Sequence, residues 1–212
     1  MSQGFSPEMN NSPQQIKSKR ECLDFFYDST ERCPVIAAVN SDELLSKAIK
    51  TNCEIIYVLY GNICTIADIV DIIFNAGKMP IVHIDLISGL ASREISVDFI
   101  KKYTKTAGII STKPHLIKRA NDLELFTIQR FFMLDTITYS NIKRHVRETA
   151  PDVVEMMPAG LTKMIEYAIE EVNGKPFVAS GLVLDKSDVM GALSAGAIAI
   201  STTNIKIWEL AD

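Results

Sequence analysis

Residues 176–204 read PFVASGLVLDKSDVMGALSAGAIAISTTN and contain one complete strand–helix–strand unit. The apolar runs at 176–180 and 197–201 are too short for helices and are rich in Val, Ile and Phe, as buried strands are. Between them, Asp185 offers an N-capping side chain to a helix, and Gly196 follows where that helix should end. The stretch therefore predicts two parallel strands joined by a helical crossover.

The same unit recurs along the chain from residue 34 onward, with capping residues such as Ser41 before the helices. Eight alternating strands and helices are the number that closes a (β/α)8 barrel, so we predict a TIM-barrel-like α/β fold with parallel strands in one compact domain. An open doubly wound sheet is the alternative, although the turn after the first strand lacks the G-x-G-x-x-G pattern of a dinucleotide site. The predicted strands are 34–39, 54–59, 79–85, 107–111, 124–130, 152–157, 176–180 and 197–201.

Composition agrees with a single globular domain. The 212 residues are 47% hydrophobic and 23% charged, enough to bury one sizeable core. Residues 1–20 are polar and irregular and are expected to form a flexible tail, followed by a short helix at 21–28 that opens a domain spanning 21–212. Without a long apolar stretch or a signal pattern, we expect a cytoplasmic protein that does not associate with membranes.

Charge and cysteine content narrow the function classes. The net charge of −4 argues against a uniformly basic nucleic-acid binder but leaves room for a local basic patch. Four cysteines without a C-x-x-C pair, together with only three histidines, predict reduced thiols and no metal site. The chain also lacks a G-x-S-x-G elbow and a strand lysine placed for Schiff-base chemistry, so a binding site is better supported than a catalytic one.

The turns after the last two predicted strands suggest a phosphate site. Ser180 and Gly181 let the backbone approach an anion, while Ser201 and Thr202 open a short helix with N–H groups and hydroxyls. Barrel phosphate sites recur at these two strand ends. The alternative is that Gly181 only makes a tight turn and Thr202 only caps the last helix.

Four further charged residues fall near other strand ends. Asp85 follows His83 by two positions in the third predicted strand, so both should point to the same side of the sheet, and we interpret His83 by itself as a core residue. Lys113, Arg130 and Glu155 would add two cations and a carboxylate around the barrel mouth. A small polar anion suits this set, although each charge could instead belong to a surface ion pair.

Five segments, in this order and at this spacing, resemble the glycerol uptake operon antiterminator family of bacterial regulators. They are 82–89 (VHIDLISG), 108–113 (GIISTK), 128–136 (IQRFFMLDT), 151–158 (PDVVEMMP) and 201–204 (STTN), the last followed by Trp208. The resemblance covers roughly residues 34–208. One departure is that the turn after the seventh strand reads Ser180-Gly181, where the family leads one to expect Gly-Gly, and no basic residue follows it.

The resemblance implies a regulator rather than an enzyme, without a cofactor, that responds to glycerol 3-phosphate. It further implies binding to a hairpin region of leader mRNA, so that transcription of glycerol catabolism genes continues past a terminator. The alternatives are a phosphosugar isomerase, aldolase or synthase that uses Asp85 or Glu155 as acid and base, and a sensor that signals through a protein partner. Homo-oligomerisation stays open. The ligand-contact positions are Asp85, Lys113, Arg130, Glu155, Ser180, Gly181, Ser201 and Thr202.

An RNA backbone would need a basic surface, and residues 99–147 provide one. Ten basic and three acidic residues give this stretch a charge of +7, against −11 for the rest of the chain. Most of these cations fall toward the ends of three consecutive predicted helices, so they should gather on the barrel face opposite the ligand. The alternative is simple compensation of helix dipoles. The predicted RNA-binding residues are Lys101, Lys102, Lys105, Lys118, Arg119, Lys143, Arg144 and Arg147.

Overall fold

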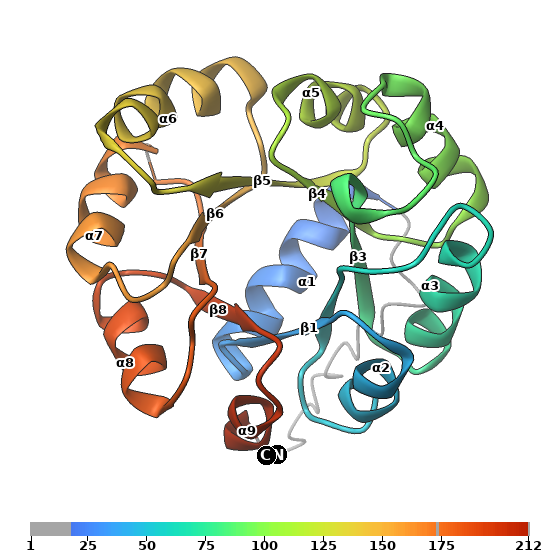
Figure 1. The fold of residues 1–212 in the computed structure, drawn as a ribbon, viewed down its shortest axis with the longest axis horizontal. Coiled ribbons are helices and arrows are strands. Elements are labelled where there is room, and N and C mark those ends of the chain that lie inside the picture. Colours follow the sequence, from blue (N-terminus) through green and yellow to red (C-terminus); the bar gives the residue numbers. More distant parts are fainter. Residues whose placement is uncertain (1–17, 173, 212) are drawn as a thin grey trace, which may run out of the picture.

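Eight parallel strands close into a barrel in chain order in the computed structural model, which describes residues 18–172 and 174–211 (Figure 1). The barrel closes where β1 pairs with β8, in the register Val35↔Ile200. This pairing confirms the predicted (β/α)8 barrel and excludes the open sheet, whose edge strands would lack partners. The strands are β1 Val35–Val39, β2 Ile55–Val58, β3 Met79–His83, β4 Gly108–Ser111, β5 Phe126–Phe132, β6 Val153–Met157, β7 Phe177–Ser180 and β8 Ala199–Thr202.

The strands divide their side chains between two cores, as the two-residue period of a strand requires. In β1, Ile36 and Ala38 point into the barrel, whereas Val35, Ala37 and Val39 pack against the surrounding helices. All five are buried. The β strands of such a barrel are buried on both faces, which is why they appear in the sequence as nearly continuous apolar runs.

Helices surround the barrel and run back along its outside (Figure 1). The expected caps are present: Ser41 accepts a hydrogen bond from the Leu44 N–H, and Asp185 forms a capping box with Asp188. Among the described residues, no helix is long and apolar enough to cross a membrane. The helices are α1 Lys19–Arg32, α2 Asp42–Ala48, α3 Ile66–Asn75, α4 Glu94–Tyr103, α5 Pro114–Asp122, α6 Thr136–Thr149, α7 Thr162–Glu171, α8 Lys186–Ser194 and α9 Ile205–Trp208.

Helix α1 covers the amino end of the barrel and is seen through the ring of strands in Figure 1. Its Phe26 is fully buried and packs on Phe126 of β5, with ring centroids 5.1 Å apart. The helix begins two residues before the predicted 21–28, where Ser18 and Glu21 form a capping box, and it continues four residues beyond the prediction to Arg32. Residues 1–17 of the predicted tail lie outside the described residues.

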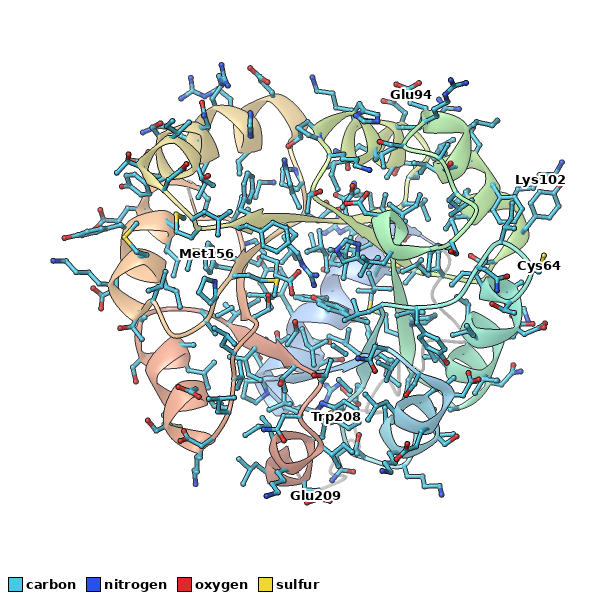
Figure 2. All side chains as sticks on the ribbon, viewed as in Figure 1. Cys64, Glu94, Lys102, Met156, Trp208 and Glu209 are labelled. Atoms are coloured by element: carbon cyan, nitrogen blue, oxygen red, sulfur yellow. The ribbon has the colours of Figure 1, made fainter. Side chains whose placement is uncertain are left out.

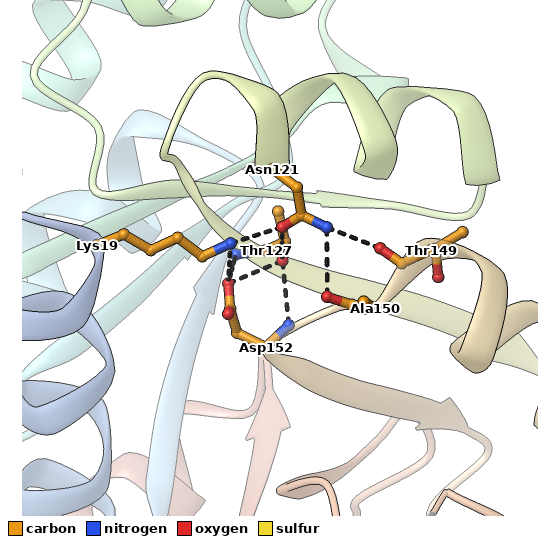
Figure 3. A network of polar contacts seen from close by, with 6 residues as sticks. All are labelled: Lys19, Asn121, Thr127, Thr149, Ala150 and Asp152. Carbon is orange, nitrogen blue, oxygen red and sulfur yellow. Dashed lines mark hydrogen bonds and ion pairs between the residues drawn. The ribbon is translucent and has the colours of Figure 1, made fainter.

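A polar network fastens the start of α1 to the barrel (Figure 3). Lys19 Nζ donates to Asn121 Oδ1 at 2.5 Å and lies 3.0 Å from Asp152 Oδ2. Asp152 Oδ2 also accepts from the backbone and side chain of Thr127, both at 2.8 Å. These contacts join α1 to the end of α5, to β5 and to the loop before β6, and so hold α1 across the amino end of the barrel.

The prediction that Asp85 lies in the third strand is wrong. The strand ends at His83, and Asp85 belongs to a 3-10 turn, Ile84–Leu86. The Asp85 carboxylate accepts hydrogen bonds from the Ser111 hydroxyl and from the backbone and hydroxyl of Thr112, at 2.8–2.9 Å. These bonds hold the turn against the end of β4 in place of further strand pairing.

Candidate functional site

A buried ion pair lies inside the barrel near its carboxyl end. Arg130 and Glu155 are register partners on β5 and β6, and Arg130 Nε donates to Glu155 Oε2 at 2.6 Å. The second carboxylate oxygen, Oε1, accepts from the Ser201 hydroxyl at 2.8 Å. Glu155 is fully buried, so these charge-assisted hydrogen bonds are what allow a carboxylate to remain inside the barrel.

Two buried polar groups near this pair lack hydrogen-bond partners among the described residues, the Tyr57 hydroxyl and His83 Nδ1. Burial, together with the nearby Arg130 charge, lowers the pKa of His83 to about 4, so the ring is neutral at pH 7. Burial, followed by the Glu155 charge, raises the pKa of Tyr57 well above its usual value. Burial opposes the charge on Arg130, but the charge and hydrogen bond of Glu155, with smaller contributions from Tyr57 and Asp85, leave the Arg130 pKa above its usual value.

A cavity of about 460 Å³ opens at the ends of β7 and β8. The structure brings five of the eight predicted ligand residues together around it. Glu155 lies directly behind the wall that Arg130 forms. The five predicted residues that line it are Arg130, Ser180, Gly181, Ser201 and Thr202.

The shape of this cavity depends on Gly181. Its φ of +71° is in the left-handed region, and a Cβ there would lie 2.5 Å from Met157 Cε. A side chain at this position would therefore push Met157 out of place, in addition to the backbone strain that a left-handed φ imposes on other residues. Gly181 therefore forms a tight left-handed turn after β7, and the approach of its backbone to an anion stays a prediction.

Thr202 accepts hydrogen bonds from two residues, Asn204 and Trp208, that were not among the predicted ligand residues. Its Oγ1 accepts from the Asn204 N–H at 3.1 Å, and its carbonyl accepts from Trp208 Nε1 at 2.8 Å. Trp208 is fully buried and lies between α9 and the strands (Figure 2). Asn204 lines the cavity and caps α9, a role that only its capping pattern could have suggested.

Asp85 and Lys113 lie outside the residues that line this cavity. Both oxygens of Asp85 already accept hydrogen bonds from the Ser111–Thr112 turn. Lys113 Nζ is 3.9 Å from Asp85 Oδ1 and is partly exposed. Their contact with a ligand stays a prediction. Within the described residues, no three His, Cys, Asp or Glu side chains form a metal-binding group.

The predicted basic surface is partly neutralised. Arg119 pairs with Asp98, Lys105 with Asp71 at 3.2 Å, and Lys143 with Glu171 at 2.9 Å, while Lys102 lies over the Tyr103 ring. Lys101, Lys102, Arg119 and Arg147 do occupy last helical turns, whereas Lys105 follows α4 and Lys143 and Arg144 lie farther back in α6. Four of the predicted residues are exposed and have neither an ion pair nor a ring contact in the described part of the chain, namely Lys101, Lys118, Arg144 and Arg147.

Comparisons with known proteins find a family model and a relative that match most of the chain. A family model described as glycerol-3-phosphate responsive antiterminator matches residues 35–208. The uncharacterized protein YgcP of Escherichia coli strain K12 is 43% identical over 178 residues, which cover 84% of this chain and 93% of YgcP.

Two solved structures are similar over most of their length. The glycerol uptake operon antiterminator regulatory protein of Listeria monocytogenes has a TM-score of 0.80 at 26% identity and covers 82% of this chain and 94% of its own. A glycerol uptake operon antiterminator-related protein of Thermotoga maritima has a TM-score of 0.75 at 24% identity, covering 84% and 98%. Deoxyribose phosphate aldolase from Aeropyrum pernix, at 14% identity and a TM-score of 0.66, covers 91% and 97% and shares the fold alone.

Proposed function

Because the chain belongs to the glycerol-3-phosphate responsive antiterminator family, we propose that it is a cytoplasmic regulator that binds glycerol 3-phosphate and leader mRNA. In this proposal, the ligand-bound protein binds the hairpin region of the leader and lets transcription of glycerol catabolism genes continue. Glycerol 3-phosphate is its effector, and it uses no cofactor.

The cavity beside Gly181 and Thr202 is the observation that carries the ligand assignment. It lies at the two strand ends where barrel phosphate sites recur, and Arg130 contributes a buried cation to its wall. We place the phosphate against the Gly181 and Thr202 turns and the glycerol hydroxyls toward Arg130. Among the described residues, no hydrogen bond of the Arg130 Nη atoms is found, so these donors are available to a ligand.

An enzyme is the competing class, and the carboxylates argue against it. A general acid or base must exchange a proton with the substrate. Glu155 is fully buried behind Arg130 and Ser201, and Asp85 is engaged with the Ser111–Thr112 turn. The likeness to aldolases is restricted to the fold.

Two measurements test the proposal. Glycerol 3-phosphate should raise the melting temperature, whereas glycerol at the same concentration should not. Only the phosphate ester can bind the Gly181 and Thr202 turns, which we call the phosphate cradle. In transcription from a leader template, protein with glycerol 3-phosphate should increase read-through of the terminator, and protein without it should not. Turnover of any triose or pentose phosphate in a panel would instead assign the protein to the enzyme class. Ligand binding without any effect on RNA or read-through would favour a sensor that acts on a protein partner.

A further inference from the structure

A second cavity of about 340 Å³ lies beside the first, between the end of β5 and helix α6. Arg130 lines both cavities. The other walls of the second cavity come from the β4–α5 turn, from β5 and its loop, and from one face of α6. These residues are Thr112, Phe131, Phe132, Leu134, Ile137, Thr138, Asn141 and His145.

The second cavity is lined by aromatic rings and by one side-chain amide. Phe132 is 45% exposed although it is a large apolar residue, and the His145 ring stacks on Phe131 with centroids 6.3 Å apart. Asn141 adds an amide that can both donate and accept hydrogen bonds. Arg144 donates to Asn141 Oδ1 at 3.0 Å, and no hydrogen bond of the Asn141 amide nitrogen is found among the described residues.

We propose that this cavity, defined here as the base cavity, holds one unpaired nucleobase of the RNA, an inference that rests on the proposed function. Unpaired bases are typically bound by stacking on aromatic side chains and by hydrogen bonds to their exposed edges. The base would stack on the rings of Phe132 and His145, and the Asn141 side-chain amide would form a hydrogen bond with the edge of the base. Arg144, which is exposed and carries no ion pair among the described residues, is placed to contact the adjoining phosphate.

The shared arginine connects this cavity to the effector. A ligand whose hydroxyls form hydrogen bonds with Arg130 in the first cavity would fix the position of a side chain that also forms a wall of the base cavity. Coupling of this kind is reciprocal, so the ligand and the RNA should each alter the affinity for the other by the same factor.

The experiment compares two exposed aromatic residues of similar exposure, Phe132 at 45% and Tyr167 at 41%. Tyr167 lies on α7 and lines neither cavity. Binding of a leader transcript from a glycerol catabolism operon is measured by filter retention for the wild type, Phe132→Ala and Tyr167→Ala, with and without glycerol 3-phosphate. Phe132→Ala should weaken RNA binding by about 5- to 150-fold, the effect of losing one stacked base. It should also remove the response of RNA affinity to the ligand, whereas Tyr167→Ala should change neither.

Two variants of α6 that introduce the same charge test the base cavity while keeping the Phe132 ring. Asn141→Asp places a carboxylate in the base cavity, and Ser140→Asp places the same charge one residue away at an exposed position. Asn141→Asp should lose more RNA affinity than Ser140→Asp. Equal losses in this pair, or normal RNA binding by Phe132→Ala, would overturn the base cavity.

The outcomes separate this inference from the proposed function. A wild-type protein that binds glycerol 3-phosphate but no leader transcript contradicts the regulatory function itself. A wild type whose ligand-dependent RNA binding survives Phe132→Ala and Asn141→Asp contradicts only the base cavity. The melting-temperature shift caused by glycerol 3-phosphate serves as the folding control, because neither variant changes a residue that lines the first cavity.

Discussion

Arg130 and Glu155 face each other across neighbouring strands inside the barrel, and each has a further role at the site. Arg130 lines both cavities, while Glu155 accepts hydrogen bonds from Arg130 Nε and from the Ser201 hydroxyl. Glu155 therefore fixes the direction of the arginine and, through Ser201, the end of β8. Together with Ser201, the pair links β5, which borders the second cavity, through β6 to β8, which borders the first.

Breaking this pair should cost much more stability than breaking a surface pair. Glu155→Ala leaves the Arg130 charge buried and uncompensated, and we expect a loss of about 3–5 kcal/mol in the free energy of unfolding. The control is Glu54→Ala, which removes the partner of the exposed Arg32 and should cost about 0–1 kcal/mol. Urea denaturation measures both. Similar losses for the two variants would show that the interior pair is well solvated.

Stability should fall as the pH is lowered from about 6.5 to about 4, in part because of His83. Its pKa is about 4 in the folded protein, against a usual value of 6.5, so in this range the unfolded chain binds more protons than the folded one. A shift of this size corresponds to about 3 kcal/mol, lost as the pH falls through the window. His83→Gln should flatten this part of the stability profile measured by urea denaturation. An unchanged slope would mean that His83 becomes protonated in the folded protein without penalty.

The phosphate cradle should not tolerate a negative charge. Thr202→Asp places a carboxylate against the ligand phosphate and should abolish the rise in melting temperature caused by glycerol 3-phosphate. The same change at Thr162, an exposed first residue of α7 outside the cavity, should leave that rise intact. A normal ligand response in Thr202→Asp would place the phosphate elsewhere.

Asp85 offers a test of the glycerol end. If its carboxylate contacts the ligand hydroxyls, Asp85→Asn should weaken glycerol 3-phosphate binding by about 1–3 kcal/mol without changing the affinity for inorganic phosphate. Calorimetric titration of both ligands decides this. If neither affinity changes, the role of Asp85 is to hold the Ser111–Thr112 turn.

The contribution of each basic residue to RNA binding should depend on whether a carboxylate already neutralises it. Replacing Lys118 and Arg147 by Gln removes two exposed cations without ion pairs among the described residues, so the salt dependence of RNA binding should weaken by about 0.7–0.9 in log–log slope for each RNA phosphate that is no longer neutralised. Replacing Lys105 and Lys143, which pair with Asp71 and Glu171, should have a smaller effect. Filter binding over a range of salt concentrations measures both double variants. If both leave the slope unchanged, the RNA does not use this surface.

The sequence by itself determined the barrel and the strand ends at which we propose the phosphate site. Strands buried on both faces produce apolar runs, and helices between them carry local caps, so the eight units could be counted without knowledge of their contacts. Gly181 and Thr202 could be placed because their position, directly after the last two strands, fixes which end of the barrel they occupy.

Only the tertiary structure decided how the polar side chains pair. The Arg130–Glu155 contact depends on the register of two strands 25 residues apart in sequence, and the pairing of Lys105 with Asp71 depends on how neighbouring helices pack. The same holds for the turn that removes Asp85 from β3, since its hydrogen bonds come from the end of another strand. Periodicity and capping are local properties of the chain, whereas ion pairs, unpartnered polar atoms and cavities arise where distant segments meet, and for that reason a sequence pattern does not contain them.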